Sequence, residues 1–185
     1  MLRNNILKIV VGCFLLLGMG FLFAAKKVSN SIHQFTIEAL DGGTIDFSKY
    51  KGKYILVVNT ASKCGFTPQY KDLQNMYELY GDKLVVVGFP SDNFGNQEFG
   101  DNKEIAAFCE KNYGVTFPLT TKVDVKGEDM HPVYKFLTQK SNNKVLDATV
   151  SWNFNKFLLD KNGKMIAHFG SKVKPDSEEI LNYIR

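Results

Sequence analysis

Two uninterrupted apolar runs in the middle of the chain predict strands that are buried on both faces. The first is Tyr54 to Asn59 (YILVVN) and the second is Leu84 to Phe89 (LVVVGF), and both are rich in β-branched residues. Between them, Thr67 and Pro68 supply a predicted helix cap and a proline at the first helical position, and apolar residues then recur at helical spacing until Gly81. This strand, helix, strand order implies parallel pairing through a right-handed crossover.

A second helix is predicted from about Lys103 to Tyr113. Asp101 supplies its N-terminal cap with Glu104 three positions later, and Gly114 ends it. Three side chains share its apolar face: Ile105, Phe108 and Cys109.

Shorter elements flank this central part. Ile32 to Ala39 alternates weakly between apolar and polar residues, and the turn Asp41-Gly42-Gly43 leads into Thr44 to Phe47, so we expect a short N-terminal hairpin. Three further elements are expected towards the C-terminus: a short helix over 131–139, a hairpin of 154–159 with 165–169, and a final helix over 177–184. This order predicts an α/β fold of the thioredoxin kind, a mixed central sheet with helices on both faces.

The N-terminal segment differs from the rest of the chain. From Ile9 to Ala25, all 17 residues are apolar or glycine, and a helix of that length would reach roughly 26 Å, near the lower limit for crossing a bilayer. We therefore expect residues 1–27 to be a signal peptide or a membrane anchor, and residues 28–185 to be the folded domain. On this interpretation the domain is exported or attached to a membrane by residues 9–25, and it lies outside the cytoplasm.

Charge separates the same two parts. The four basic residues before Glu38 account for the net charge of +4: Arg3, Lys8, Lys26 and Lys27. The remaining acidic and basic residues balance, and no run of five or six basic residues occurs. A neutral domain of this kind gives no electrostatic surface for a phosphate backbone, so we expect no nucleic-acid binding.

Two cysteines remain in the domain once Cys13, which lies in the apolar segment, is set aside. Neither Cys64 nor Cys109 belongs to a CxxC pair, so a zinc ribbon or a dithiol exchange site is not indicated. The pair leaves three interpretations open: a structural disulfide, two inert buried thiols, or a redox pair. Since His33, His131 and His168 are scattered without metal-ligand spacing, we expect neither a metal nor another cofactor.

Cys64 stands where a reactive thiol is expected. It follows a buried strand and precedes a helix, so its sulfur should lie near the positive end of the helix dipole and near unpaired backbone N–H groups. Both features stabilise the thiolate, which is the nucleophilic form. The alternative is an inert core cysteine, because cysteine is among the most buried residue types.

Three motifs resemble the glutathione peroxidase family, and they occur in the family's order. Val57 to Thr67 (VVNTASKCGFT) is similar to the peroxidatic loop, with cysteine where some relatives have selenocysteine. Phe89 to Glu98 (FPSDNFGNQE) and Trp152-Asn153-Phe154 resemble the other two signatures. The resemblance covers Ile32 to Ile184. It implies a thioredoxin-like fold and an antioxidant peroxidase that reduces hydrogen peroxide and organic hydroperoxides.

The resemblance also implies a catalytic tetrad of Cys64, Gln97, Trp152 and Asn153. Side-chain amides and an indole N–H can donate hydrogen bonds to a thiolate or to a peroxide oxygen. Such donors lower the pKa of the thiol and stabilise the charge that develops as the O–O bond breaks. Without the resemblance, these residues would be interpreted as a turn glutamine, a core tryptophan and a strand-edge asparagine.

Cys109 lies in a stretch, Phe108 to Pro118, that is similar to the segment carrying the resolving cysteine in members regenerated by thioredoxin. This resemblance implies that a Cys64 sulfenic acid condenses with Cys109 to an internal disulfide. Thioredoxin or a related dithiol protein would then recycle the enzyme, with glutathione as the alternative reductant. The simpler interpretation is a buried thiol on the face of a helix.

Two positions depart from the family pattern. Ser91 stands where many relatives have another cysteine, which removes a rival resolving thiol, and Phe99 replaces a common proline. The short segment from Lys140 to Val150 lacks the additional assembly loop of tetrameric relatives, so we expect a monomer. Two alternative functions remain: a peroxide-sensing relay protein, and a thiol-disulfide oxidoreductase, which normally requires a CxxC.

Overall fold

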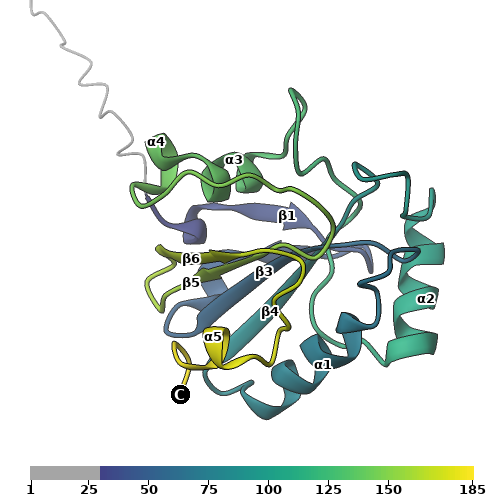
Figure 1. Ribbon diagram of the computed structural model, residues 1–185, viewed down its shortest axis with the longest axis horizontal. Helices are drawn as coiled ribbons and strands as arrows, with labels where there is room; N and C mark the ends of the chain where they lie inside the picture. Colours follow the sequence, from purple (N-terminus) through teal and green to yellow (C-terminus); the bar gives the residue numbers. More distant parts are fainter. Residues whose placement is uncertain (1–29) are drawn as a thin grey trace, which may run out of the picture.

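The computed structural model describes residues 30–185, and a four-stranded mixed sheet lies at its centre (Figure 1). The strands are β3 (Tyr54–Thr60), β4 (Leu84–Pro90), β5 (Lys156–Leu159) and β6 (Met165–Phe169), in the spatial order β4-β3-β5-β6. The two apolar runs form β3 and β4 and pair in parallel, as predicted, while β5 pairs antiparallel with both β3 and β6. The thioredoxin-like fold is therefore confirmed.

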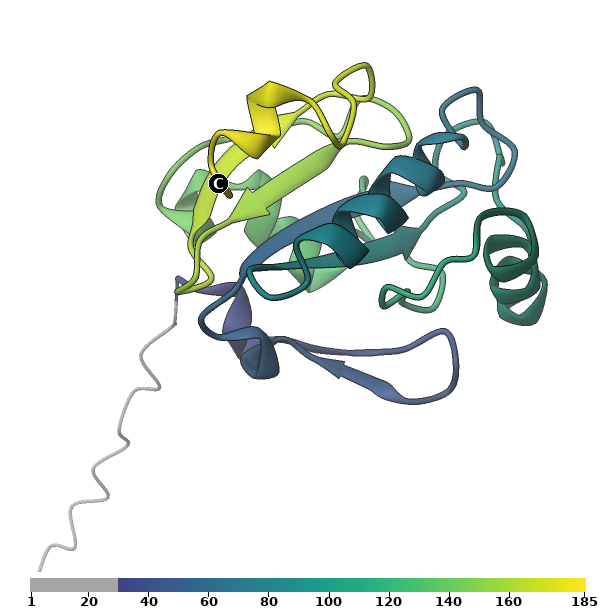
Figure 2. The same ribbon diagram turned by 90° about the horizontal axis from the view of Figure 1, so that it is seen from below.

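Alternate residues of β3 point into two separate cores. Ile55 and Val57 belong to one core, and Leu56 and Val58 belong to the other; all four are fully buried. A strand with apolar side chains on both faces requires a covering layer on each side. In Figure 1 one layer is α3 (Pro132–Thr138) with the N-terminal hairpin, and the other is α1 (Gln69–Leu79) with α5 (Glu178–Leu181). Figure 2 shows this second layer from its own side.

The predicted hairpin is present but forms a sheet of its own. Its strands are β1 (Thr36–Glu38) and β2 (Thr44–Asp46), which pair antiparallel and are flanked by single 3-10 turns at 32–34 and 47–50. Ile37 lies opposite Ile45, and both side chains are buried in the same core as α3. The hairpin therefore covers one face of the central sheet without extending it.

Helix α2 (Asn102–Tyr113) has the ends that the sequence predicts. The Asp101 carboxylate accepts hydrogen bonds from the backbone N–H groups of Lys103 (2.7 Å) and Glu104 (3.3 Å). Gly114 ends the helix in the left-handed conformation, with φ of +60°. Helix α2 stands at the end of the molecule where β3 leads into the Cys64 loop (Figures 1 and 2).

The start of α1 differs from the prediction. The helix begins at Gln69 with Pro68 at its N-cap, and Thr67 makes no side-chain cap. The Thr67 hydroxyl instead accepts from the backbone N–H of Cys64 and donates to the carbonyl of Ala61. The Thr67 side chain, which the local sequence predicts to be a helix cap, therefore stabilises the preceding loop instead.

Two C-terminal elements also differ in extent. The last helix spans only Glu178–Leu181, and single turns continue it to Arg185. The segment from Lys140 to Val150 contains a short helix of its own, α4 (Lys140–Asn143), which the pattern did not reveal. The Asn143 amide donates to three backbone carbonyls, those of Phe136, Leu137 and Leu146, and so ties α4 to α3.

The predicted signal peptide or membrane anchor, residues 9–25, lies outside the described residues. Within residues 30–185, no helix combines the length and the apolar character needed to span a bilayer.

Candidate active site

Cys64 lies in the loop between β3 and α1, and local hydrogen bonds hold that loop. Its side chain is 8% exposed. Its backbone N–H donates to the Thr67 hydroxyl at 3.0 Å, and that hydroxyl donates to the carbonyl of Ala61 at 2.8 Å. The backbone N–H of Phe66 donates to the Cys64 Sγ at 3.4 Å. The turn therefore provides a fixed backbone donor to the sulfur.

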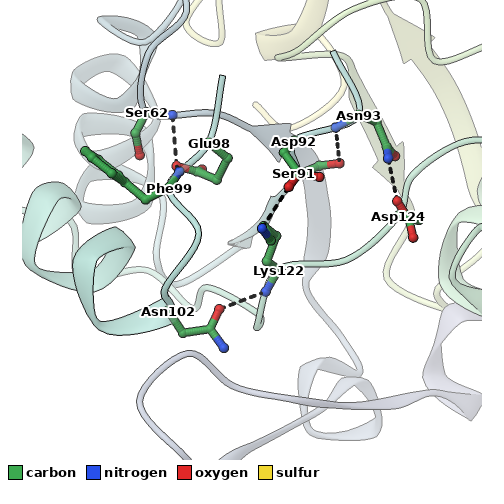
Figure 3. Close-up of polar contacts among 9 residues, drawn as sticks. All are labelled: Ser62, Ser91, Asp92, Asn93, Glu98, Phe99, Asn102, Lys122 and Asp124. Atoms are coloured by element: carbon green, nitrogen blue, oxygen red, sulfur yellow. Dashed lines mark hydrogen bonds and ion pairs between the residues drawn. The ribbon is translucent and has the colours of Figure 1, made fainter. Parts of the chain in front are cut away.

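The loop carrying Gln97 is bonded to the Cys64 loop at two adjacent positions. The backbone N–H of Lys63 donates to the Gln97 carbonyl at 2.9 Å. The backbone N–H of Ser62 donates to a carboxylate oxygen of Glu98 at 3.2 Å, as Figure 3 shows. Burial raises the pKa of the Glu98 carboxyl, and the hydrogen bonds from Ser62 and Phe99 oppose that rise.

The rest of the Gln97 loop is anchored to residues 122–124 (Figure 3). The Lys122 ammonium pairs with the Asp92 carboxylate at 2.7 Å, and the backbone N–H of Lys122 donates to the Asn102 side chain at 3.2 Å. The Asn93 amide donates to the Asp124 carboxylate. Both ends of the loop are thus attached to one neighbouring strand-like segment, which limits how far Gln97 can move.

Gln97 and Asn153 contact each other directly. The Asn153 amide N–H donates to the Gln97 side-chain oxygen at 3.0 Å. This orientation uses the Gln97 oxygen and leaves its amide N–H groups for other acceptors. Asn153 is fully buried, and its side-chain oxygen has no hydrogen-bond partner within residues 30–185.

Asn59 at the end of β3 holds the turn that carries Trp152 and Asn153. Its amide donates to the Trp152 carbonyl at 3.0 Å, and its side-chain oxygen accepts from the backbone N–H of Asn155 at 3.0 Å. Its own carbonyl accepts from the backbone N–H of Phe154, which has φ of +61°. The sequence does not predict this role of Asn59; its only local signal is a polar residue that closes a buried apolar run.

Trp152 is the exposed member of the candidate site. It is 39% exposed, and its ring packs against Phe94 with centroids 5.6 Å apart. Trp152 also lines an apolar pocket of about 400 Å³ together with Phe66 and residues 151 and 170–173. Phe66 thus both lines this pocket and donates its backbone N–H to the Cys64 sulfur.

The structure therefore brings the four predicted residues together through a continuous set of contacts. The Cys64 loop is bonded to the Gln97 loop, Gln97 is bonded to Asn153, and Trp152 precedes Asn153 in a turn held by the strand that leads to Cys64. A thiol, two amides and an indole on loops connected in this way can reduce an electrophilic oxygen and donate hydrogen bonds to the group that leaves.

Cys109 lies in the buried face of α2 and belongs to the same apolar core as Cys64. It is 1% exposed, and both it and Cys64 are free thiols, so the structural disulfide left open by the sequence is absent from this part of the chain. Burial raises the pKa of the Cys109 thiol to about 11; the Tyr70 hydroxyl opposes this rise and the Glu98 carboxylate adds to it. In its place in α2, Cys109 is a protonated and weakly reactive thiol.

The histidines have structural surroundings. The His131 Nδ1 accepts from the backbone N–H of Val133 and caps α3. The His168 ring stacks on Phe157 with centroids 4.6 Å apart, and its Nε2 bonds the Asn155 side-chain oxygen at 2.9 Å. Among residues 30–185, no three His, Cys, Asp or Glu side chains are grouped to hold a metal ion.

The departure at position 99 has a visible consequence. The backbone N–H of Phe99 donates to the Glu98 carboxylate at 2.9 Å, a bond that a proline could not make. Its ring packs against Phe108 of α2 with centroids 5.6 Å apart, and the Lys63 ammonium lies 4.1 Å from its centroid. Phe99 thus connects the Cys64 loop to the helix that carries Cys109. Ser91, the other departure, is fully buried, and its hydroxyl accepts from the backbone N–H of Asn93.

Comparison with known proteins places this geometry in a family. The family model for glutathione peroxidase matches residues 32–138. A glutathione peroxidase of Lactococcus lactis is 45% identical over 150 residues, covering 80% of this chain and 95% of the relative. A hydroperoxy fatty acid reductase of Synechocystis sp. is 47% identical over 156 residues, covering 81% and 92%. A glutathione peroxidase-like peroxiredoxin of Schizosaccharomyces pombe is 50% identical over 140 residues, covering 75% and 88%.

Solved structures agree with this placement. The crystal structure of Trgpx in its apo form is 39% identical with a TM-score of 0.64, covering 84% of this chain and 94% of that one. The crystal structure of GPX1 from T. cruzi is 29% identical with a TM-score of 0.62, covering 83% and 92%. A DsbF homologue from Corynebacterium diphtheriae, 20% identical with a TM-score of 0.55, covers 80% and 83% and shares the fold alone.

The comparisons also correct the predicted localisation. The relatives from Lactococcus lactis and Halalkalibacterium halodurans are matched over 95% and 99% of their length, so they consist almost entirely of the domain and leave no room for a counterpart of residues 1–27. The prediction of an exported or membrane-anchored domain outside the cytoplasm is therefore wrong; it rested on the apolar pattern of residues 9–25 alone.

Proposed function

The chain belongs to the glutathione peroxidase family and is a peroxidase, and from this premise we propose that Cys64 is the thiol that attacks the peroxide. The observation that carries the proposal is the contact of the Cys64 sulfur with the N–H of Phe66, a residue of the loop before α1 that also lines the pocket beside Trp152. A backbone donor of this kind stabilises the thiolate without a second thiol.

In the proposed first step, the Cys64 thiolate attacks one peroxide oxygen. An S–O bond forms as the O–O bond breaks, and the leaving oxygen takes a proton and departs as water or alcohol. The sulfur is oxidised to a sulfenic acid and the peroxide is reduced. Because negative charge develops on the leaving oxygen, donors placed beside it lower the barrier.

We assign that donor role to Gln97, Trp152 and Asn153. The bond from Asn153 to the Gln97 oxygen supports the assignment, since it turns the Gln97 N–H groups towards other acceptors. The partial exposure of Trp152 supports it too, because its indole N–H can reach a substrate that enters from solvent.

In the proposed second step, Cys109 attacks the Cys64 sulfenic acid. A disulfide forms and the sulfenic oxygen leaves as water, so no added oxidant is needed. Thioredoxin or a related dithiol protein would then reduce the disulfide, with glutathione as the alternative reductant. The burial of Cys109 and the high pKa of its thiol support an order of events in which α2 opens before this attack.

We further propose that the protein is a monomer. The connection from α3 to Trp152 is short, and the Asn143 bonds to carbonyls of α3 fold it back against its own domain. Sedimentation of the purified protein at two concentrations gives the mass that decides between a monomer and an oligomer.

The donor assignment predicts the behaviour of two variants. Gln97→Ala and Trp152→Ala should slow the oxidation of Cys64 by about 10- to 1000-fold, the range expected for loss of one preorganised donor. Rapid mixing with peroxide, followed by alkylation of the remaining thiols, measures this rate constant. Gln139→Ala is the matched control, because Gln139 lies at the junction of α3 and α4, away from the site. Wild-type oxidation rates in both active-site variants would remove the tetrad from the mechanism.

A further inference from the structure

Lys156 is a fully buried lysine in the strand that follows the Trp152 turn. It lies at the start of β5, and its side chain is 0% exposed. Its ammonium donates to three backbone carbonyls: those of Phe154 at 2.9 Å, Ser171 at 3.4 Å and Val173 at 2.6 Å. The first belongs to the turn that carries Asn153, and the other two belong to the segment after β6. One side chain therefore joins the two loops at the point where the β5–β6 pairing ends, with Lys156 opposite Phe169.

Ser171 joins the same two loops from the opposite direction. Its hydroxyl donates to the Asn153 carbonyl at 2.5 Å and accepts from the Asn155 amide at 3.1 Å. The Asn155 amide also donates to the Trp152 carbonyl at 2.7 Å. The Ser171 carbonyl accepts from the Gln69 amide at 2.8 Å, so the first turn of α1 is tied to the same point.

From these contacts we infer that Lys156 and Ser171 are positioning residues, which together fix the 152–155 turn against the 170–173 segment and thereby aim Trp152 and Asn153 at the substrate of Cys64. This inference rests on the proposed roles of Trp152 and Asn153. Neither Lys156 nor Ser171 is expected to touch the peroxide. They act through the backbone of the residues that do.

The chemistry of a lysine suits this role. An ammonium group can donate three hydrogen bonds and accepts no hydrogen bond. Three carbonyls that point at it therefore use all of its donors. Burying it is unfavourable, and burial lowers the pKa of Lys156 to about 7, while the carboxylate of Asp72 on α1 opposes that shift. An apolar residue of similar length would fill the same space without that cost, but it would remove the donor from the carbonyls of Phe154 and Val173. The two loops would then be joined through Ser171 without the lysine.

The same segment also lines the pocket beside Trp152. Residues 170–173 line it together with Phe66, Ser151 and Trp152. Loss of the Lys156 and Ser171 bonds would therefore change the width of the pocket as well as the direction of the donors. A displacement of about 1 Å at reacting groups can cost on the order of 100-fold in rate.

The test compares Lys156→Met and Ser171→Ala with wild-type protein in two measurements. The first is the rate constant for oxidation of Cys64 by peroxide, which should fall by about 10- to 100-fold in Lys156→Met and by roughly 3- to 10-fold in Ser171→Ala. The second is the emission spectrum and acrylamide quenching of Trp152, the only tryptophan in the chain. The emission and the quenching should change in each variant, because a displaced turn alters the surroundings of the Trp152 ring. A general loss of stability in a protein that is still folded would not change them.

The controls separate this inference from the proposed function. Lys164→Met makes the same substitution at an exposed lysine in the turn between β5 and β6, and it should leave both measurements at wild-type values. The oxidation rate of Trp152→Ala is measured in parallel. If Trp152→Ala is slow while Ser171→Ala and Lys156→Met keep the wild-type rate or the wild-type emission, the positioning role is wrong. The proposed function then stands. If Trp152→Ala is itself as fast as wild type, the proposed function fails first. Should Lys156→Met fail to fold, the milder Ser171→Ala decides the outcome alone.

Discussion

Replacing Cys64 with serine should abolish peroxide reduction. A serine hydroxyl is essentially un-ionised at neutral pH, whereas the attacking species that we propose is a thiolate, and the Cys64 sulfur lies near the backbone N–H of Phe66. Removing a nucleophile from an enzyme typically leaves less than roughly one-thousandth of the activity. The measurement is peroxide consumption with an excess of a reduced dithiol protein.

Cys109→Ser is the matched control for this experiment, because it makes the same change at the other thiol of the domain. That variant should still consume one equivalent of peroxide, since Cys64 is intact. Circular dichroism of both variants establishes that the fold is retained. Substantial peroxide turnover by Cys64→Ser would show that another group attacks the peroxide, and it would remove Cys64 from the centre of the mechanism.

The second large effect concerns turnover. Cys109→Ser should fail to turn over with thioredoxin although it reacts once with peroxide, because its sulfenic acid has no internal thiol with which to condense. We expect the steady-state rate to fall by at least about 100-fold, on the scale of losing an intramolecular partner whose effective concentration is high. Sustained thioredoxin-driven turnover in this variant would leave Cys109 as a core thiol without a resolving role.

This second prediction requires a movement of α2. The Cys109 carbonyl accepts a hydrogen bond from the backbone N–H of Val115, and the Glu110 carbonyl accepts one from the backbone N–H of Gly114. The capped end of the helix therefore depends on Cys109 remaining in place. A helix of about three turns is marginal without its packing and caps. Hydrogen exchange should therefore be faster in oxidised than in reduced protein across residues 102–117, and nearly equal elsewhere. Equal exchange in this helix would contradict the proposed opening.

The central architecture could be predicted from the sequence because its signals are local. The apolar runs of β3 and β4, the Asp101 cap and the left-handed Gly114 each follow from neighbouring residues, and all are present in the structure. The N-terminal hairpin was also predicted, although its separation from the central sheet depends on how Ile37 and Ile45 pack against α3.

The parts that could not be predicted depend on contacts between distant segments. Thr67 was expected to cap α1, but its hydroxyl closes the Cys64 loop instead. Asn59 binds the backbone carbonyl of Trp152, far along the chain, and Lys156 binds that of Val173 in the loop after β6. No local pattern in the sequence identifies such partners. The four candidate site residues were named from family motifs, and only the fold shows which contacts bring them together.

The most direct test of the account is a map of the thiols after one equivalent of peroxide. Mass spectrometry of wild-type protein should show a peptide in which Cys64 is linked to Cys109, with both thiol hydrogens lost and all of the added peroxide consumed. Omitting peroxide should leave both thiols free, as they are in the structure. Consumed peroxide with Cys64 converted to higher oxides and Cys109 still a free thiol, or peroxide left unreacted beside two free thiols, would contradict the account.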